Sequence, residues 1–352
     1  MLRRAEDFIA LNSRSRRRIS PRALISYVTV ASLGFSLPAN AKHTYTTFDP
    51  AGSVGTTAFS INNGAIAGSY GDSNGVNHGF VRAADGTITS FDPSGSVLTN
   101  AVSINEGGAI VGYYADSNYV YHGFVRAANG TITSFDPSGS TYTDAVSINY
   151  RGKITGAYKD SNSVVHGFLR AEDGTITTFD PSGSIATNPN SINNQGAITG
   201  LYTDSNYVVH GFVRAADGTI TSFDPLGSTD TNAHGINKEG AIAGSYNDYF
   251  KVPQGFVRTT AGAITTFDVS SALSTIVVSI DNRSQITGAY IDRNYAYHGF
   301  VRSANGAIRS FDPPGSAETI PESIDSVGTD NGAIAGYYFD SSGVSHGFVR
   351  SP

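Results

Sequence analysis

Six histidines recur at one position of a repeated motif, and histidine is the side chain that most often binds metals or moves protons near neutral pH. They precede Gly-Phe and are His78, His122, His166, His210, His298 and His346. Equivalent positions of successive repeats lie too far apart to share one ion, and no second type of ligand accompanies them. We therefore predict no metal site, and we expect each imidazole to hydrogen-bond backbone at the end of a strand.

Repeated carboxylates and arginines show the same regularity. Tyr-x-Asp recurs from Tyr70 and Asp72 to Tyr338 and Asp340. A hydrolase with two carboxylates needs them in different environments, so equivalent groups do not form a catalytic pair. We expect these Asp residues to open turns and the repeated Arg to pair with Asp. Asp-Ser-Asn resembles half of a calcium loop but lacks the other oxygen ligands, so we expect no calcium and no cofactor.

One histidine within the repeats departs from the pattern. His234 lies in Ala233-His234-Gly235, and Lys238 and Glu239 are close to it in the sequence. An imidazole beside a carboxylate can act as a general base, so His234 is the candidate catalytic residue. The alternative is that His234 is a substituted strand residue.

Tyrosines distinguish some repeats from the others. The turn after Asp-Ser-Asn or its equivalent carries Tyr119, Tyr207 and Tyr295 in alternate repeats. Tyr rings grouped on one rim can stack on sugar rings or dock a protein segment. We therefore take these three as candidate ligand-binding residues, with the alternative that they only cover loop edges. Further aromatic residues near such turns are Tyr121, Tyr249, Phe250 and Tyr297.

The spacing of the repeats predicts the fold. Phe-Asp recurs at intervals of 43 or 44 residues from Phe48 to Phe311, and Gly-Phe-(Val/Leu)-Arg recurs at intervals of 44 or 48. In residues 101–137 we expect strands at 101–105, 109–114, 120–126 and 131–136, with Asn129-Gly130 as a two-residue hairpin turn. Four antiparallel strands in about 44 residues match one propeller blade. The sequence thus predicts an all-β, seven-bladed β-propeller of four-stranded antiparallel blades.

Two-residue turns also predict a register. They place Phe80 opposite Phe91 across the hairpin, an arrangement that aromatic pairs favour. The same rule predicts the pairs Phe124 with Phe135, Phe168 with Phe179, Phe212 with Phe223, Phe256 with Phe267, and Phe300 with Phe311. The last repeat lacks its fourth strand, so we expect residues 45–49 to pair with residues 347–351, with Phe48 opposite Phe348. This pairing would close the ring and remove an open sheet edge.

The N-terminus has the pattern of an export signal. Residues 1–22 contain seven Arg, residues 23–37 form an apolar run, and Ala39-Asn40-Ala41 matches a cleavage site. We predict a signal peptide over residues 1–41, a single seven-repeat domain over residues 42–352, and a secreted or periplasmic protein. The Arg cluster at 16–18 also loosely resembles a twin-arginine signal, and a downstream start codon is a further alternative.

Composition excludes several classes of function. The 352 residues contain no Cys and no Trp, which excludes disulfide scaffolds, thiol nucleophiles and thiolate metal sites. Without residues 1–41 the formal charge is −11, which disfavours nucleic acid and anionic membranes as partners. No apolar stretch after residue 41 is long enough to span a bilayer. We expect a monomer with no nucleic-acid partner and no membrane insertion.

The repeated motifs resemble those of a known family. Ser-Ile-Asn, Gly-Ala-Ile-x-Gly and His-Gly-Phe-Val-Arg, at this spacing, resemble the HAF family of bacterial extracellular repeats over about residues 44–350. The chain departs from the family where Gly79 and its equivalents replace the Ala of the His-Ala-Phe triplet, and where Gln254 replaces His. The resemblance implies an exported bacterial repeat protein and brings no activity, cofactor or catalytic residue.

Three functions follow as hypotheses. The first is a non-enzymatic interaction module that binds an extracellular or cell-envelope glycan, or a protein, through one propeller rim. The second is an extracellular hydrolase or lyase with a site in the central channel, which would involve His234. The third is a purely structural surface repeat, because near-identical repeats arise by duplication without selection for a ligand.

Overall fold

The computed structural model describes residues 43–327 and 332–352, and the four-strand unit predicted from the sequence recurs through them. The predicted signal peptide, residues 1–41, lies outside the described residues. In the stretch analysed above, the strands are Leu98–Ile104, Ile110–Ala115, Tyr121–Arg126 and Ile132–Phe135. The number, order and approximate bounds of the four strands are therefore confirmed. Among the described residues, no helix is long and apolar enough to cross a membrane.

Each strand occupies one of four positions in a unit. The first strands are β2 (Ser53–Asn62), β6 (Leu98–Ile104), β10 (Tyr142–Ile148), β14 (Ser184–Ile192), β18 (Asp230–Ile236), β22 (Ser274–Ile280) and β26 (Glu318–Ile324). The second strands are β3 (Ala65–Asp72), β7 (Ile110–Ala115), β11 (Ile154–Lys159), β15 (Ile198–Asp204), β19 (Ile242–Asn247), β23 (Ile286–Ile291) and β27 (Ile334–Phe339).

The third and fourth strands complete the units. The third strands are β4 (Asn77–Arg82), β8 (Tyr121–Arg126), β12 (Val165–Arg170), β16 (Val209–Arg214), β20 (Pro253–Arg258), β24 (Tyr297–Arg302) and β28 (Ser345–Arg350). The fourth strands are β1 (Tyr45–Phe48), β5 (Ile88–Phe91), β9 (Ile132–Phe135), β13 (Ile176–Phe179), β17 (Ile220–Phe223), β21 (Ile264–Phe267) and β25 (Ile308–Phe311). Units are numbered below by their first strand, so the first unit begins with β2 and the last with β26.

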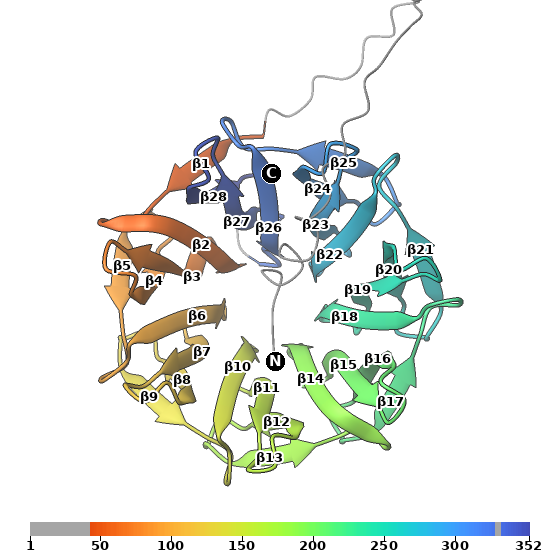
Figure 1. Cartoon of the computed structure of the whole chain (residues 1–352), viewed down its shortest axis with the longest axis horizontal. Coiled ribbons are helices and arrows are strands. Elements are labelled where there is room, and N and C mark those ends of the chain that lie inside the picture. Colours follow the sequence, from red (N-terminus) through yellow and green to blue (C-terminus); the bar gives the residue numbers. More distant parts are fainter. Residues whose placement is uncertain (1–42, 328–331) are drawn as a thin grey trace, which may run out of the picture. The chain divides into compact units, whose positions relative to one another are not determined.

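The units lie around a common centre. Within a unit each strand pairs antiparallel with the next, as in β6, β7, β8 and β9. Figure 1 shows the first strands directed toward the centre and the fourth strands near the periphery. The last unit has the strand order β1-β28-β27-β26, and Tyr45 lies opposite Arg350. The two ends of the described chain therefore meet in one sheet, in the pairing expected for residues 45–49 and 347–351.

The hairpin between the third and fourth strands has a three-residue loop, not the two-residue turn expected. In the first unit the N–H of Ala83 donates to the carbonyl of Thr87, and that of Gly86 donates to the carbonyl of Ala83. Gly86 has a φ of 94°, in the left-handed region that glycine tolerates. A turn that ends in such a glycine forms a bulge and shifts the register by one residue.

The predicted cross-strand Phe pairs are consequently wrong. Gly79 lies opposite Phe91, whereas Phe80 lies opposite Ser90. The same shift separates Phe124 from Phe135, Phe168 from Phe179, Phe212 from Phe223, Phe256 from Phe267, and Phe300 from Phe311. At the chain ends Phe48 faces Gly347 instead of Phe348. The glycine opposite each Phe leaves room for the ring, since a Cβ on Gly79 would lie 3.1 Å from the Phe91 ring, closer than an ordinary contact.

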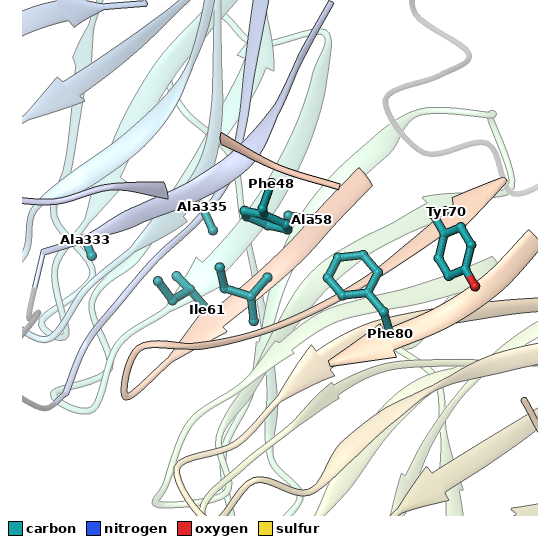
Figure 2. Packing of buried hydrophobic residues seen from close by; sticks show 8 residues of the cluster. Phe48, Ala58, Ile61, Tyr70, Phe80, Ala333 and Ala335 are labelled. Atoms are coloured by element: carbon teal, nitrogen blue, oxygen red, sulfur yellow. The ribbon is translucent and has the colours of Figure 1, made fainter. Parts of the chain in front are cut away.

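The phenylalanines pack between units instead of across hairpins. The rings of Phe48 and Phe80 meet edge to face with centres 6.0 Å apart, and Figure 2 shows Phe48 beside Ala335 of the last unit, in the same hydrophobic cluster as Phe80. The same contact, at 6.0–6.3 Å, joins Phe91 with Phe124, Phe135 with Phe168, Phe179 with Phe212, Phe223 with Phe256, Phe267 with Phe300, and Phe311 with Phe348. The hydrophobic core therefore continues from each unit into the next.

The repeated arginines reinforce these junctions. The guanidinium carbon of Arg82 lies 5.1 Å from the centre of the Phe48 ring, and that of Arg126 lies 4.9 Å from the Phe91 ring. Such cation–π contacts contribute about 0.5–2 kcal/mol each. The expected Arg–Asp pairing is wrong, because Asp85 supplies only a longer-range attraction to Arg82.

Candidate functional site

The turn between the second and third strands positions the candidate tyrosines. Asp116 Oδ1 accepts hydrogen bonds from the N–H groups of Asn118 at 2.8 Å and Val120 at 2.9 Å. The N–H of Tyr119 donates to the Asp116 carbonyl at 2.9 Å. The hydrogen bond from Val120, followed by those from Asn118, holds the pKa of Asp116 below its usual range. The prediction that these Asp residues open turns is confirmed.

The tyrosines occupy a backbone conformation that disfavours them. Tyr119, Tyr207 and Tyr295 have φ values of 59°, 63° and 67°. Gly75 and Gly343 occupy the same turn position in the first and last units, as the left-handed region favours. A side chain there costs about 1 kcal/mol. The tyrosines are 74%, 81% and 69% exposed, so burial of their rings does not offset this cost.

These turns lie at the end of each unit away from the centre. Leu98 pairs with Ala115 at this end of β6, whereas Ile104 pairs with Ile110 at the central end. The link between units runs beside the turn, because the N–H of Val97 donates to the carbonyl of Ala115 at 2.8 Å. Turns and links therefore share one rim, as expected. The three tyrosines stand in three different units and occupy separate positions along it.

Each repeated histidine lies between two carboxylates. His122 Nδ1 is 2.7 Å from Asp136 Oδ2, and its Nε2 is 3.8 Å from Asp116 Oδ2. Its ring packs on Tyr114 with centres 5.2 Å apart. The expected hydrogen bond to backbone is therefore wrong. The signal for the true partners was present in the sequence, because the Asp of Tyr-x-Asp and the Asp of Phe-Asp recur with the same period as the histidine.

The same geometry joins the ends of the chain. His346 Nδ1 lies 2.7 Å from Asp49 Oδ2, which belongs to the segment after β1. In the fifth unit Gln254 replaces the imidazole, and its Nε2 donates to Asp248 Oδ2 at 3.0 Å. Tyr246 there donates its hydroxyl hydrogen to Gln254 Oε1 at 2.6 Å. Within residues 43–327 and 332–352, no cluster of three His, Asp or Glu side chains is arranged to hold a metal ion.

These contacts predict a pH-dependent stability. The hydrogen bond to Asp49 raises the pKa of His346. Burial would lower the pKa of His210, but hydrogen bonds and attraction to Asp224 and Asp204 outweigh it, so that pKa is also raised. The stabilisation is complete below the pKa of the unfolded chain, about 6.5, and is lost as pH rises through the higher folded-state values. We therefore expect the melting temperature to fall as pH rises above about 6.5.

Gln254 provides the matched comparison for this prediction. The double variant His210→Gln, His346→Gln should show a weaker dependence of melting temperature on pH, because glutamine does not titrate. The variant Gln254→His should show a stronger dependence, because it adds an imidazole between Asp248 and Asp268. A melting temperature of the unaltered chain that stays constant between about pH 6 and 8 would contradict the assignment.

His234 lies at an irregularity of β18. Ala233 pairs with Gly244 and Gly235 pairs with Ala243, so His234 is the additional residue of a bulge. Lys238 lines the central cavity, but His234 and Glu239 are not among the lining residues. Lys238 Nζ lies 3.5 Å from Glu239 Oε1. The three residues are thus not gathered in that cavity, and a catalytic role of His234 stays a prediction.

The Ser-Ile-Asn motif surrounds a central cavity of about 170 Å³. Asn105 Nδ2 donates to the carbonyl of Asn149 at 3.0 Å, and Asn149 Nδ2 donates in the same way to Asn193. Ser103 Oγ accepts a hydrogen bond from the N–H of Ile148 at 3.4 Å. The motif therefore links neighbouring units. Sequence analysis missed this role, although polar residues repeated at the end of an apolar strand are a signal for it.

Comparison with known proteins assigns the architecture. No family model matches the chain, and a search of curated proteins finds no relative. The β-propeller domain of the Trilobed protease from Pyrococcus furiosus is similar in structure, with a TM-score of 0.61, 9% identity, and coverage of 85% of this chain and 95% of that chain. The BP39L lectin from Burkholderia pseudomallei gives a TM-score of 0.56 and 11% identity over 85% of this chain and 97% of that chain.

A puromycin-hydrolyzing peptidase from Mycobacterium tuberculosis gives a TM-score of 0.58 at 7% identity. The match covers 82% of this chain and 52% of the peptidase, so the chain spans about half of that protein's length. At these identities the likeness concerns the fold alone. Together with the antiparallel four-strand units, these structures show that the described part of the chain is a β-propeller.

Proposed function

We propose that the chain is a seven-bladed propeller, closed by β1 on β28, that binds extracellular or cell-envelope glycans through its rim without catalysing a reaction. The observation that carries the proposal is the placement of Tyr119, Tyr207 and Tyr295 in a left-handed turn position while their rings stay exposed. When a side chain is disfavoured in its backbone conformation and is also little buried, the residue points to a role other than folding. The predicted export signal makes the proposed location secreted or periplasmic, and the HAF-type repeat is the proposed family.

Exposed tyrosine suits sugar binding. Its ring offers a flat apolar face to the C–H groups of a sugar, and its hydroxyl can hydrogen-bond sugar oxygens. One of the similar structures is a lectin, so a fold of this kind is compatible with sugar binding. The regular spacing of the three tyrosines on alternate units favours a ligand with repeated sugars, because several weak contacts then act together.

The triple variant Tyr119→Gly, Tyr207→Gly, Tyr295→Gly tests the proposal. We expect the free energy of unfolding to rise by about 1 kcal/mol per substitution, because glycine tolerates the left-handed conformation. We expect glycan binding to weaken by about tenfold or more, because each lost ring contact removes about 0.5–1.5 kcal/mol. Denaturant titration measures the first quantity, and a panel of immobilised oligosaccharides and polysaccharide fragments measures the second.

Ser163 supplies the control, because it occupies the same turn position with a φ of 65° and has no ring. Ser163→Gly should raise stability in the same way and leave glycan binding unchanged. If the unaltered chain binds no glycan of the panel, or if the triple variant binds as well as the unaltered chain, the rim is not a glycan site. Lower stability of the triple variant would mean that the tyrosines serve the fold.

A further inference from the structure

One junction between units contains a cluster of aromatic side chains that the next junction lacks. Tyr121 of β8 and Tyr142 of β10 have ring centres 5.0 Å apart, and Tyr113 of β7 lies 5.9 Å from Tyr121. The equivalent residues at the next junction, 44 positions later, are Ala157, Val165 and Ala186. Since that junction forms with small side chains, the three rings are not required for joining units.

A lysine stands beside this cluster. Lys159 lies opposite Tyr142 on the neighbouring strand β11, and its Nζ is 5.3 Å from the centre of the Tyr142 ring. Two of the described lysines, Lys238 and Lys251, form ion pairs with carboxylates, and Lys159 has no carboxylate oxygen within 4.0 Å among residues 43–327 and 332–352. The positions equivalent to Lys159 in the adjoining units hold Ala115 and Thr203.

The cluster opens onto the rim. Tyr113, Tyr121, Tyr142 and Lys159 are all half-buried. The turn that leads into Tyr121 carries Tyr119 and Val120, which are 74% and 37% exposed. A ligand on the rim can therefore reach partly desolvated rings and an ammonium group together. In such surroundings an ion pair is stronger than on an open surface.

We propose that Tyr113, Tyr121, Tyr142 and Lys159 form a subsite for a sugar that carries a carboxylate, such as a uronic acid residue of an acidic polysaccharide. The rings would contact the C–H face of the sugar, and the ammonium group would pair with its carboxylate. Charge complementarity argues for this ligand over a neutral sugar, because in an acidic chain, of formal charge −6 overall, the Lys159 ammonium group has no carboxylate oxygen within 4.0 Å among the described residues. This inference rests on the proposed glycan-binding function and specifies its ligand.

The experiment is isothermal titration of the full chain with trigalacturonate and with its fully methyl-esterified form, which has the same sugars without the charge. We expect trigalacturonate to bind at least tenfold more tightly than the ester, and added salt to reduce this difference. Lys159→Thr, which introduces the residue of the following unit, should lower the affinity for trigalacturonate to that for the ester. The triple variant Tyr113→Ala, Tyr121→Val, Tyr142→Ala, which copies the next junction, should remove binding of both.

Two further variants separate this inference from the proposed function. Tyr297→Val, made at the position equivalent to Tyr121 on β24, should leave trigalacturonate binding unchanged. Equal affinity of the unaltered chain for acid and ester, or unchanged affinity of Lys159→Thr for the acid, would overturn the acidic-sugar subsite. A third outcome would overturn this subsite alone and leave the proposed function standing. It is that neutral glycans bind the unaltered chain, that the glycine variant of Tyr119, Tyr207 and Tyr295 loses this binding, and that the triple variant of Tyr113, Tyr121 and Tyr142 keeps it. Binding of a proline-rich peptide, and of neither sugar, at the three rings would overturn both proposals.

Discussion

A chain that begins at Gly52, and so lacks β1, should lose cooperative unfolding. Removal of β1 takes the Phe48 ring from its contact with Phe80 and leaves the outer edge of β28 unpaired. It also removes Asp49, which accepts a 2.6 Å hydrogen bond from the Thr56 hydroxyl and lies 2.7 Å from His346 Nδ1. The losses fall on both the first and the last unit. Their sum should be comparable with the whole stability of a typical domain, about 5–15 kcal/mol.

Circular dichroism during thermal and denaturant unfolding measures this effect. The reference is a chain that begins at Lys42 and keeps β1. A synthetic peptide of residues 42–52, added to the chain that begins at Gly52, should restore part of the transition in a concentration-dependent way, because its binding couples to folding. An unchanged melt of the shorter chain would show that the pairing of β1 with β28 does not hold the ends together.

Gly156→Ala should destabilise the protein by about 3 kcal/mol or more, at the upper end of the effects seen when a core is overpacked. A Cβ at this position of β11 would overlap the carbonyl oxygen of Asp144 on β10 and would approach the Phe168 ring to 2.9 Å. The carbonyl belongs to the strand backbone and the Phe168 ring is fully buried, so neither can move aside. This close approach explains the last glycine of Gly-Ala-Ile-x-Gly and its equivalents.

Gly71 of β3 is the matched control. It also lies in a second strand, but a Cβ there would meet only Val54 Cγ2 at an ordinary contact distance of 3.8 Å. Gly71→Ala should therefore be neutral or slightly stabilising, because it reduces the freedom of the unfolded chain. The two variants are compared by their free energies of unfolding in urea. Equal stabilities would mean that the tight packing at Gly156 is not part of the native structure.

The repeat period carried most of the information about the fold. Alternating apolar residues with turn residues at fixed offsets predict the four strands of the second unit, and the structure places them within three residues of the expected bounds. The register was not predictable to the same degree. Asp85-Gly86 is compatible with either a two-residue or a three-residue loop, and only the left-handed Gly86 at the end of the longer loop distinguishes them.

The candidate site was predictable in part. Tyr119 and its equivalents were placed on the rim because aromatic residues stand out where the repeats differ. The cluster of Tyr113, Tyr121, Tyr142 and Lys159 could not be found in this way, because residues up to 46 positions apart come together only across a junction between two sheets. The carboxylate partners of the histidines were missed although Asp136 lies only 14 positions from His122 in the same unit, because the expected hairpin register was shifted by one residue.

The hydrogen bonds around the central cavity are directional, since Asn105, Asn149, Asn193 and Asn237 each donate to the carbonyl of the residue 44 positions ahead. Four successive junctions, from the second unit to the sixth, therefore follow the same local rule, and none of these bonds depends on how many units the chain contains. Recombination between near-identical coding repeats would give chains with more or fewer units whose internal junctions are all satisfied. If the ring closes as proposed, the pairing of β1 with β28 is the step that would reject the wrong number, and one short strand would then set the number of units.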